Sequence, residues 1–195
     1  KRSKNLKFKM KKALVLTETF EINDPKKEIF LIGDWCITER NENFFKNFNY
    51  NICKSFSEDN SNILENYKKC ENIYESLIKD IRLRLNEKLN TNFSERAWKI
   101  IIGHWLKRFI YICFDRYHNL KRILEEYKVD EIYSLSTKEY SLATEDTLGI
   151  YLGSINDTWN NKIYNLILEH LGFSNINKLA CKERQLEYQD SFKIE

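Results

Sequence analysis

The sequence predicts an α/β protein with a parallel, Rossmann-like sheet and long flanking helices. Residues 13–17 and 28–33 are short, continuous apolar runs, and the second run ends in glycine. Such runs are typical of central strands in a covered parallel sheet. Residues 130–136 alternate with a period of two, which indicates another strand. Long segments in which apolar residues recur every three or four positions lie between and after these strands, and they predict helices.

Three helices are expected. Residues 61–89 have one apolar face and one charged face, and the preceding residues 57–61 offer N-cap side chains. Residues 94–126 have the pattern of one long helix that begins at Ser94. Residues 157–171 form the third helix, capped at Asn156 or Asp157 and stopped by Gly172.

Within the central helix, the segment from Trp98 to Trp105 is expected to pack on the sheet, and Gly103 would allow a close approach. Residues 50–56 are a weaker candidate for a third strand. Residues 137–154 have the pattern of a polar connection with glycine turns, and no core-forming pattern follows Phe173.

The composition narrows the class of protein. The 32 basic and 29 acidic residues nearly balance at a net charge of +3, and part of the excess lies in the first dozen residues. A nucleic-acid-binding protein would concentrate its basic residues in a stripe, so no nucleic-acid partner is predicted. The five cysteines are widely spaced and form no zinc pattern, which indicates reduced thiols in a cytoplasmic protein. No apolar run approaches a membrane span.

Three regions are predicted from these patterns. Residues 1–12 are a basic, flexible head or a tag remnant. Residues 13–173 form the Rossmann-like α/β domain, and residues 174–195 form a polar C-terminal segment.

Several short motifs occur in an order that resembles a known family. They are LTETFE at residues 16–21, IFLIGDWC at 29–36, and AWKIIIGHWL at 97–106 followed by FDRY at 114–117. The sequence resembles a bacterial transferase family associated with surface-polysaccharide loci and first catalogued from spirochaete genomes. Its members read approximately LTTxxExTW, LFLGEWC, WRILIGPWL with a following DR, and DxWNH. The resemblance covers roughly residues 11–165.

The resemblance implies that the full-length protein is longer than this chain. Members of the family are longer and are thought to be similar to glycosyltransferases with two Rossmann-like halves. This chain would then be the N-terminal, acceptor-side half, and a C-terminal half would be missing. A nucleotide-activated sugar donor would bind mainly to that half, and no cofactor is expected in this chain.

The sequence departs from the family at three positions, one of which is Phe20 in the first motif, where the family tends to have other residues. His104 stands where the family has proline, and Asn161 stands where it has histidine. The departure at position 104 lowers the rank of His104 as a functional residue.

The first candidate site lies at the predicted carboxyl edge of the sheet. Asp34 follows the second strand and Glu18 follows the first, so either carboxylate could serve as the general base that activates an acceptor hydroxyl. Thr17 and Trp35, their neighbours in the two motifs, are expected to bind substrate, with Trp35 as a sugar-stacking platform. The alternatives are a helix or turn cap for Asp34, a solvated loop residue for Glu18 and a core position for Trp35.

The second candidate site lies on the central helix. His104, Arg108, Asp115 and His118 share one helical face that could bind a phosphate or a sugar, or could be an ordinary solvated face. Arg116 projects toward the apolar side, where a guanidinium must be paired. Asp115 and Arg116 therefore either lock the helix to its neighbours or bind an anion in a cleft. No phosphate-binding glycine motif, nucleophile elbow or acidic metal cluster occurs, and no metal site is predicted.

The function that fits these observations is transfer of a glycosyl or related group to a hydroxyl of a sugar or glycan acceptor, in surface-polysaccharide assembly. The alternative from another class is a non-catalytic helical module that docks a protein partner. A nucleic-acid-associated protein is a third hypothesis, suggested only by the basic head.

Overall fold

Five short strands form one sheet in which every neighbouring pair is parallel. The computed structural model describes residues 10–19, 21, 22, 24–56, 62–138 and 140–180. The strand order is β3-β2-β1-β4-β5. The strands are β1 Lys12–Val15, β2 Glu28–Leu31, β3 Asn49–Ile52, β4 Glu131–Leu135 and β5 Ile176–Leu179. The α/β class and the parallel sheet are therefore confirmed.

The centre of the sheet is fully buried. Ala13, Leu14 and Val15 of β1, and Ile29 and Leu31 of β2, have no exposed surface. Consecutive buried residues require cover on both faces of the sheet, which explains why these strands have continuous apolar runs.

The fifth strand, β5, was not predicted. It pairs with β4 alone, and only Leu179 among its four residues is buried. An edge strand of this kind needs no apolar run, so its polar sequence gave no strand signal.

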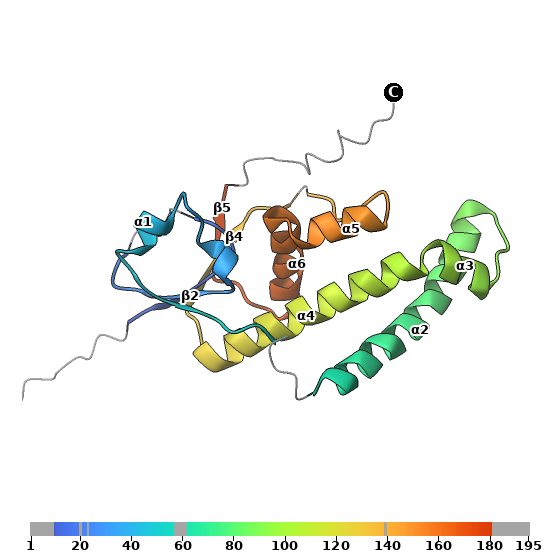
Figure 1. Cartoon of the computed structure of the whole chain (residues 1–195), viewed down its shortest axis with the longest axis horizontal. Coiled ribbons are helices and arrows are strands. Elements are labelled where there is room, and N and C mark those ends of the chain that lie inside the picture. Colours follow the sequence, from blue (N-terminus) through green and yellow to red (C-terminus); the bar gives the residue numbers. More distant parts are fainter. Residues whose placement is uncertain (1–9, 20, 23, 57–61, 139, 181–195) are drawn as a thin grey trace, which may run out of the picture.

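Three helices connect β3 to β4, and two of them form a hairpin that extends away from the sheet (Figure 1). They are α2 Ile63–Leu89, α3 Glu95–Ile101 and α4 Gly103–Tyr127. The prediction of a single helix over residues 94–126 is wrong in one respect, because the segment forms two helices. Ile102, with φ −118° and ψ −7°, separates α3 from α4. Ser94 caps α3 as expected, accepting a hydrogen bond from the Ala97 backbone N–H.

The two halves of α4 pack against different partners. Leu106 and Ile110, near its start, join Trp98 of α3 in a core formed with α2. Leu120 and Ile123, near its end, join the core around the sheet. The prediction that the segment from Trp98 to Trp105 packs on the sheet is therefore wrong for Trp98 and Gly103, whereas Trp105 borders both cores.

Two further helices lie between β4 and β5. Helix α6 (Asp157–His170) was predicted, and Asn156 caps it by accepting a hydrogen bond from the Trp159 N–H at 2.9 Å. Helix α5 (Thr147–Ser154) was not predicted, because its two glycines indicated turns. One of them, Gly153, instead lets α5 approach Trp159, whose ring would lie 2.9 Å from an added Cβ. Helices α4 and α6 contact each other (Figure 1). The connections from β3 to β4 and from β4 to β5 run across the sheet in the same direction. Right-handed crossovers therefore place their helices on the same face of the sheet.

The shorter elements follow β2. They are the 3-10 helix η1 (Asp34–Cys36) and α1 (Glu42–Phe45). The N-cap residues predicted at 57–61, most of the basic head and residues 181–195 of the polar C-terminal segment lie outside the described residues.

The contact of Gly103 with Tyr74 of α2 generates a prediction. An added Cβ at Gly103 would lie 2.6 Å from the Tyr74 hydroxyl oxygen and 3.7 Å from Cζ. Gly103→Ala should therefore lower the free energy of unfolding by about 1–2 kcal/mol, although alanine favours helix by up to about 1 kcal/mol over glycine. Urea unfolding measures the change.

Tyr74→Phe provides the matched background, since it removes only the oxygen that would clash. In that background Gly103→Ala should be neutral or stabilising. An equal loss of stability in both backgrounds would contradict the close approach.

Candidate functional site at the carboxyl edge of the sheet

The strand order reverses between β1 and β4, and open α/β sheets bind ligands at the carboxyl ends of strands beside such a reversal. Thr17 and Glu18 follow β1 at this edge, and Ser136 and Thr137 follow β4. The predicted residues Asp34 and Trp35 follow β2, the other neighbour of β1. Four of the predicted residues therefore follow two adjacent strands at one edge of the sheet.

Helix α6 closes the reversal point with side chains four residues apart, Asp157, Asn161 and Asn165. The Asn161 amide lies between the two strand ends and has no exposed surface. Its Nδ2 donates to the Leu16 carbonyl at 3.2 Å, and its Oδ1 accepts from the Leu135 N–H at 3.1 Å. A side chain of α6 thus satisfies backbone groups that lie beyond the last pair formed between β1 and β4, Val15 with Tyr133.

Asn165 continues this row toward β5. Its Nδ2 donates to the Leu135 carbonyl at 2.9 Å and to the Thr137 hydroxyl at 2.8 Å. The Ser134 hydroxyl lies 3.1 Å from Asn161 Oδ1 and 2.7 Å from Asn165 Oδ1, and its single proton serves one of them at a time. The two asparagines and Ser134 form one hydrogen-bonded network.

Asp157 is a carboxylate at this edge whose pKa is raised by its surroundings. Burial raises its pKa to about 6, although hydrogen bonds from the Thr17 hydroxyl and the Glu18 backbone N–H favour the ionised form. The negative charge of Glu18 raises the pKa further, while a hydrogen bond from Asn161 lowers it. A partly buried carboxylate that titrates near neutral pH is suited to accept and return a proton.

Glu18 and Thr17 occupy defined positions around Asp157. Glu18 accepts a hydrogen bond from Arg40 at 2.9 Å and another from the Thr38 hydroxyl. Thr17 is 1% exposed and donates its hydroxyl proton to Asp157. Thr17 is therefore placed to orient the Asp157 carboxylate.

Asp34 and Trp35 are exposed in η1. The Trp35 side chain lies over Gly33, where an added Cβ would meet the ring. Its exposed fraction is 45%, which leaves part of the ring open to a ligand. Asp34 and Trp35 thus follow β2, and Glu18 follows the adjacent strand β1, at the same edge of the sheet.

The second predicted site does not form one cluster. Arg116 donates to Asp115 at 2.6 Å, to Asn160 Oδ1 at 3.0 Å and to the Ser154 carbonyl at 3.4 Å. These bonds join α4 to α5 and α6, so the expectation that Arg116 must be paired is confirmed. The exposed His104 lies twelve residues earlier on α4, about 18 Å along the helix.

Arg108 and His118, two other members of the predicted polar face, contact different aromatic rings. The Arg108 guanidinium lies 4.8 Å from the Tyr151 ring centroid, and the His118 ring stacks on Phe56 at 5.0 Å. Burial lowers the pKa of His118.

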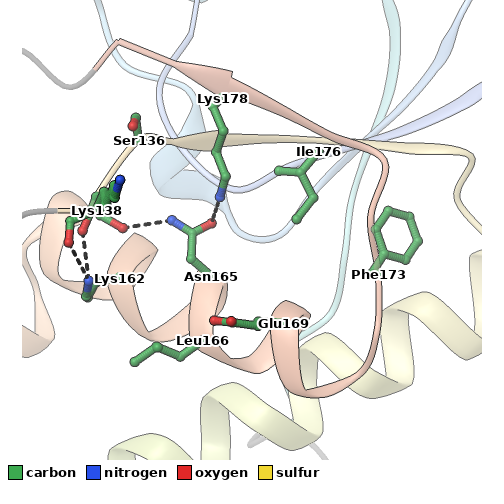
Figure 2. Close-up of a pocket in the computed structure, with 10 residues that line it drawn as sticks. Ser136, Lys138, Lys162, Asn165, Leu166, Glu169, Phe173, Ile176 and Lys178 are labelled. Atoms are coloured by element: carbon green, nitrogen blue, oxygen red, sulfur yellow. Dashed lines mark hydrogen bonds between the residues drawn. The ribbon is translucent and has the colours of Figure 1, made fainter.

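A pocket of about 420 Å³ lies between α6 and the ends of β4 and β5 (Figure 2). Lysines gather at one end of it: Lys162 donates to the Thr137 and Lys138 carbonyls at 2.9 and 3.1 Å, and Lys178 donates to Asn165 Oδ1. Asn165 thereby joins the pocket to the network at the reversal point.

Sequence reasoning missed the row on α6 and both of these lysines. The four-residue spacing of Asp157, Asn161 and Asn165 was the available signal, since it aligns three polar side chains on one face of a helix. The abundance of asparagine and lysine in the chain concealed it.

The sheet and its flanking helices define an α/β protein with a parallel sheet, whose polar carboxyl edge is the candidate ligand site. In the described part of the chain, no group of three or more His, Cys, Asp or Glu residues is arranged to hold a metal ion. No described helix has the length and apolar character needed to cross a bilayer.

The comparison with known families agrees with this class. The model of the LIC12162 family transferase matches residues 12–194, and the chain belongs to this family. No curated protein matches the chain, and no solved structure matches it.

The raised pKa of Asp157 generates a prediction about stability. Folding raises the pKa from 3.8 to about 6, so the native state is stabilised by the protonated carboxyl, and this contribution is lost as pH rises through 6. Relative to Asp157→Asn, the wild-type protein should lose up to about 3 kcal/mol between pH 4 and pH 7. Urea unfolding at several pH values measures the difference.

Thr17→Val is the matched control, because it removes a hydrogen bond that favours the ionised form. It should raise the pKa of Asp157 further and extend the pH-dependent loss to higher pH. Parallel stability curves for the wild type and Asp157→Asn would show that Asp157 is not perturbed by burial.

Proposed function

We propose that this chain is the acceptor-side half of a glycosyltransferase, or of a related group transferase, that acts in cell-surface polysaccharide assembly. Membership of a transferase family supports the reaction type, and the resemblance described above supports the pathway. The observation that carries the proposal is the Asp157 carboxyl, held at the strand reversal with a pKa of about 6.

In the proposed reaction, a carboxylate removes the proton from an acceptor hydroxyl as its oxygen attacks the activated carbon of the donor. The donor bond breaks, and the nucleotide leaves with the bonding electrons. A base works best when its pKa lies near the working pH, because it is then deprotonated and still able to take a proton. Asp157 meets this requirement.

The predicted residues take supporting roles in this proposal. Glu18 and Asp34, the carboxylates proposed from sequence as the base, remain candidates for binding acceptor hydroxyls or sharing the proton transfer. Glu18 is already engaged by Arg40 and Thr38, which favours a binding role. Trp35 offers a half-exposed ring for stacking on a sugar face.

The donor is proposed to be a nucleotide-activated sugar held mainly by a further C-terminal half of the full-length protein. This part of the proposal rests on the resemblance alone. Asp115, Arg116 and His104 receive no direct role, because the first two join α4 to α5 and α6 and the third lies about 18 Å away along α4.

The alternative, a helical interaction module, has one observation in its favour. An apolar groove of about 570 Å³ lies along α2 and α4, lined by residues that include Ile73, Leu77 and Phe109. Within the described residues nothing shows what covers this groove, and family membership favours transfer.

The test uses the full-length protein and a panel of nucleoside diphosphate sugars. At least one donor should raise the melting temperature, because a ligand that binds only the native state stabilises it. A panel that gives no shift would contradict transfer from a nucleotide sugar.

The role of Asp157 is tested with the donor that binds. Asp157→Asn should lower kcat for nucleotide release about a hundredfold or more, with a smaller change in KM. Glu125→Gln, at an exposed position of α4, is the control and should retain the wild-type rate. Activity of Asp157→Asn within threefold of wild type would remove Asp157 as the base.

A further inference from the structure

The pocket beside β5 has two chemically different ends (Figure 2). Lys138, Lys162 and Lys178 lie at one end, together with Ser136 and Thr137. Phe173 and Ile176 form an apolar wall at the other end. A pocket with a few convergent polar groups and an apolar wall is the usual form of a small-molecule site.

The ammonium groups of two lysines are held in place. Lys162 Nζ donates to the Thr137 carbonyl at 2.9 Å and to the Lys138 carbonyl at 3.1 Å. Lys178 Nζ donates to Asn165 Oδ1, and Asn165 is itself fixed by the Leu135 carbonyl. Because each ammonium has three protons, both lysines can still donate to a ligand.

The positive charge at this end is not neutralised within the described residues. None of the three lysines forms an ion pair with a described carboxylate. Glu169 lines the pocket but pairs with none of them. Burial lowers the pKa of Lys178, because its charge is partly removed from water without a compensating anion.

We propose that this pocket binds the phosphate group of a phosphorylated small molecule, with the phosphate at the lysine end, against Lys162, Lys178 and the Asn165 amide that lies between them, and its carrier group against Phe173 and Ile176. Lysine ammonium groups bind phosphate as point charges. A pocket of about 420 Å³ has room for the carrier group beside the phosphate. Binding of a phosphate here does not depend on the transferase function proposed above. Only the assignment of the bound molecule as a substrate of the transfer reaction rests on that function.

Position supports that assignment. Asn165 contacts Lys178, and the same residue shares Ser134 with Asn161, whose Nδ2 lies 3.1 Å from an Asp157 carboxylate oxygen. The lysines and the proposed base therefore belong to one connected network on α6. A phosphorylated acceptor could be anchored at the lysines while its reacting part extends along the carboxyl edge.

Calorimetric titration of the full-length protein tests the proposal with inorganic pyrophosphate and a hexose 1-phosphate as probes. A parallel sedimentation assay uses vesicles with and without a lipid that carries a phosphate monoester headgroup. Lys178→Gln and Lys162→Gln should each weaken binding about tenfold or more. Lys88→Gln, at an exposed position near the end of α2, should bind as the wild type does. Circular dichroism establishes that each variant is folded.

Binding of the soluble probes through Lys162 and Lys178 supports a free phosphorylated substrate. Binding to the phosphate-bearing vesicles alone, again lost in both variants, supports a lipid-linked one. Failure of both arms, or equal binding by Lys178→Gln and wild type, would overturn the proposal. The failure would concern this site alone, because the nucleotide-sugar and Asp157 measurements do not depend on the lysines.

Discussion

The amide of Asn161 is the contact on which the arrangement of this edge depends. At the reversal of a parallel sheet, the chain segments that follow the two neighbouring strands run in different directions. The backbone N–H and C=O groups just beyond the last strand pair then lack hydrogen-bond partners in the sheet. Asn161 supplies an acceptor for the Leu135 N–H and a donor for the Leu16 carbonyl from one side chain. Its remaining Nδ2 proton is directed to Asp157, either to the carbonyl at 2.9 Å or to the carboxylate at 3.1 Å. Asn161 is fully buried, so water cannot replace its amide. Losing the amide would therefore leave several polar groups without a hydrogen-bond partner.

This contact also bears on where the proposed substrates would bind. The crevice at the strand reversal, which is open in many Rossmann-like proteins, is here filled by side chains of α6. A pocket of about 420 Å³ lies beside this filled crevice, toward β5. Asp157, Glu18 and Trp35 lie toward β1 and β2, while Lys162 and Lys178 lie toward β5. Asn161 and Asn165 connect the two regions through hydrogen bonds to the Ser134 hydroxyl.

The proposed chemistry needs both regions. A hydroxyl acceptor requires a base that titrates near neutral pH, and burial gives Asp157 that property. A phosphorylated substrate requires fixed positive charge, which the network provides by holding Lys178 against Asn165. Helix α2 and the first half of α4 enclose a second core that is separate from the core around the sheet (Figure 1). The apolar groove along α2 and α4 is a separate feature of the molecule.

Much of the fold could be predicted from local sequence patterns. The apolar runs of β1 and β2, the alternation of β4 and the cap of α6 were predictable because each depends on neighbouring residues. The break at Ile102 could not be predicted in this way. The helical period continues through it, and the break reflects packing of Trp98 and Gly103 against α2. Helix α5 and strand β5 were missed because tertiary contacts, with Trp159 and with β4, outweigh weak local preferences.

The candidate site was predicted less completely. Parallel strands end at one edge, so the positions of Glu18 and Asp34 followed from the fold class alone. Arg116 was expected to need partners, and it has them in Asp115, Asn160 and the Ser154 carbonyl. Which helix would contribute to the strand ends depends on long-range packing, and for that reason Asp157 was not identified.

The most direct test of this account is amide hydrogen exchange at Leu135 in the wild type and in Asn161→Ala, together with the free energy of unfolding. If the Asn161 amide joins β1 to β4, the substitution should strongly reduce protection of the Leu135 N–H and should cost about 2–4 kcal/mol. Protection of Leu135 that is unchanged, with a loss of stability below about 0.5 kcal/mol, would contradict the role given to this contact.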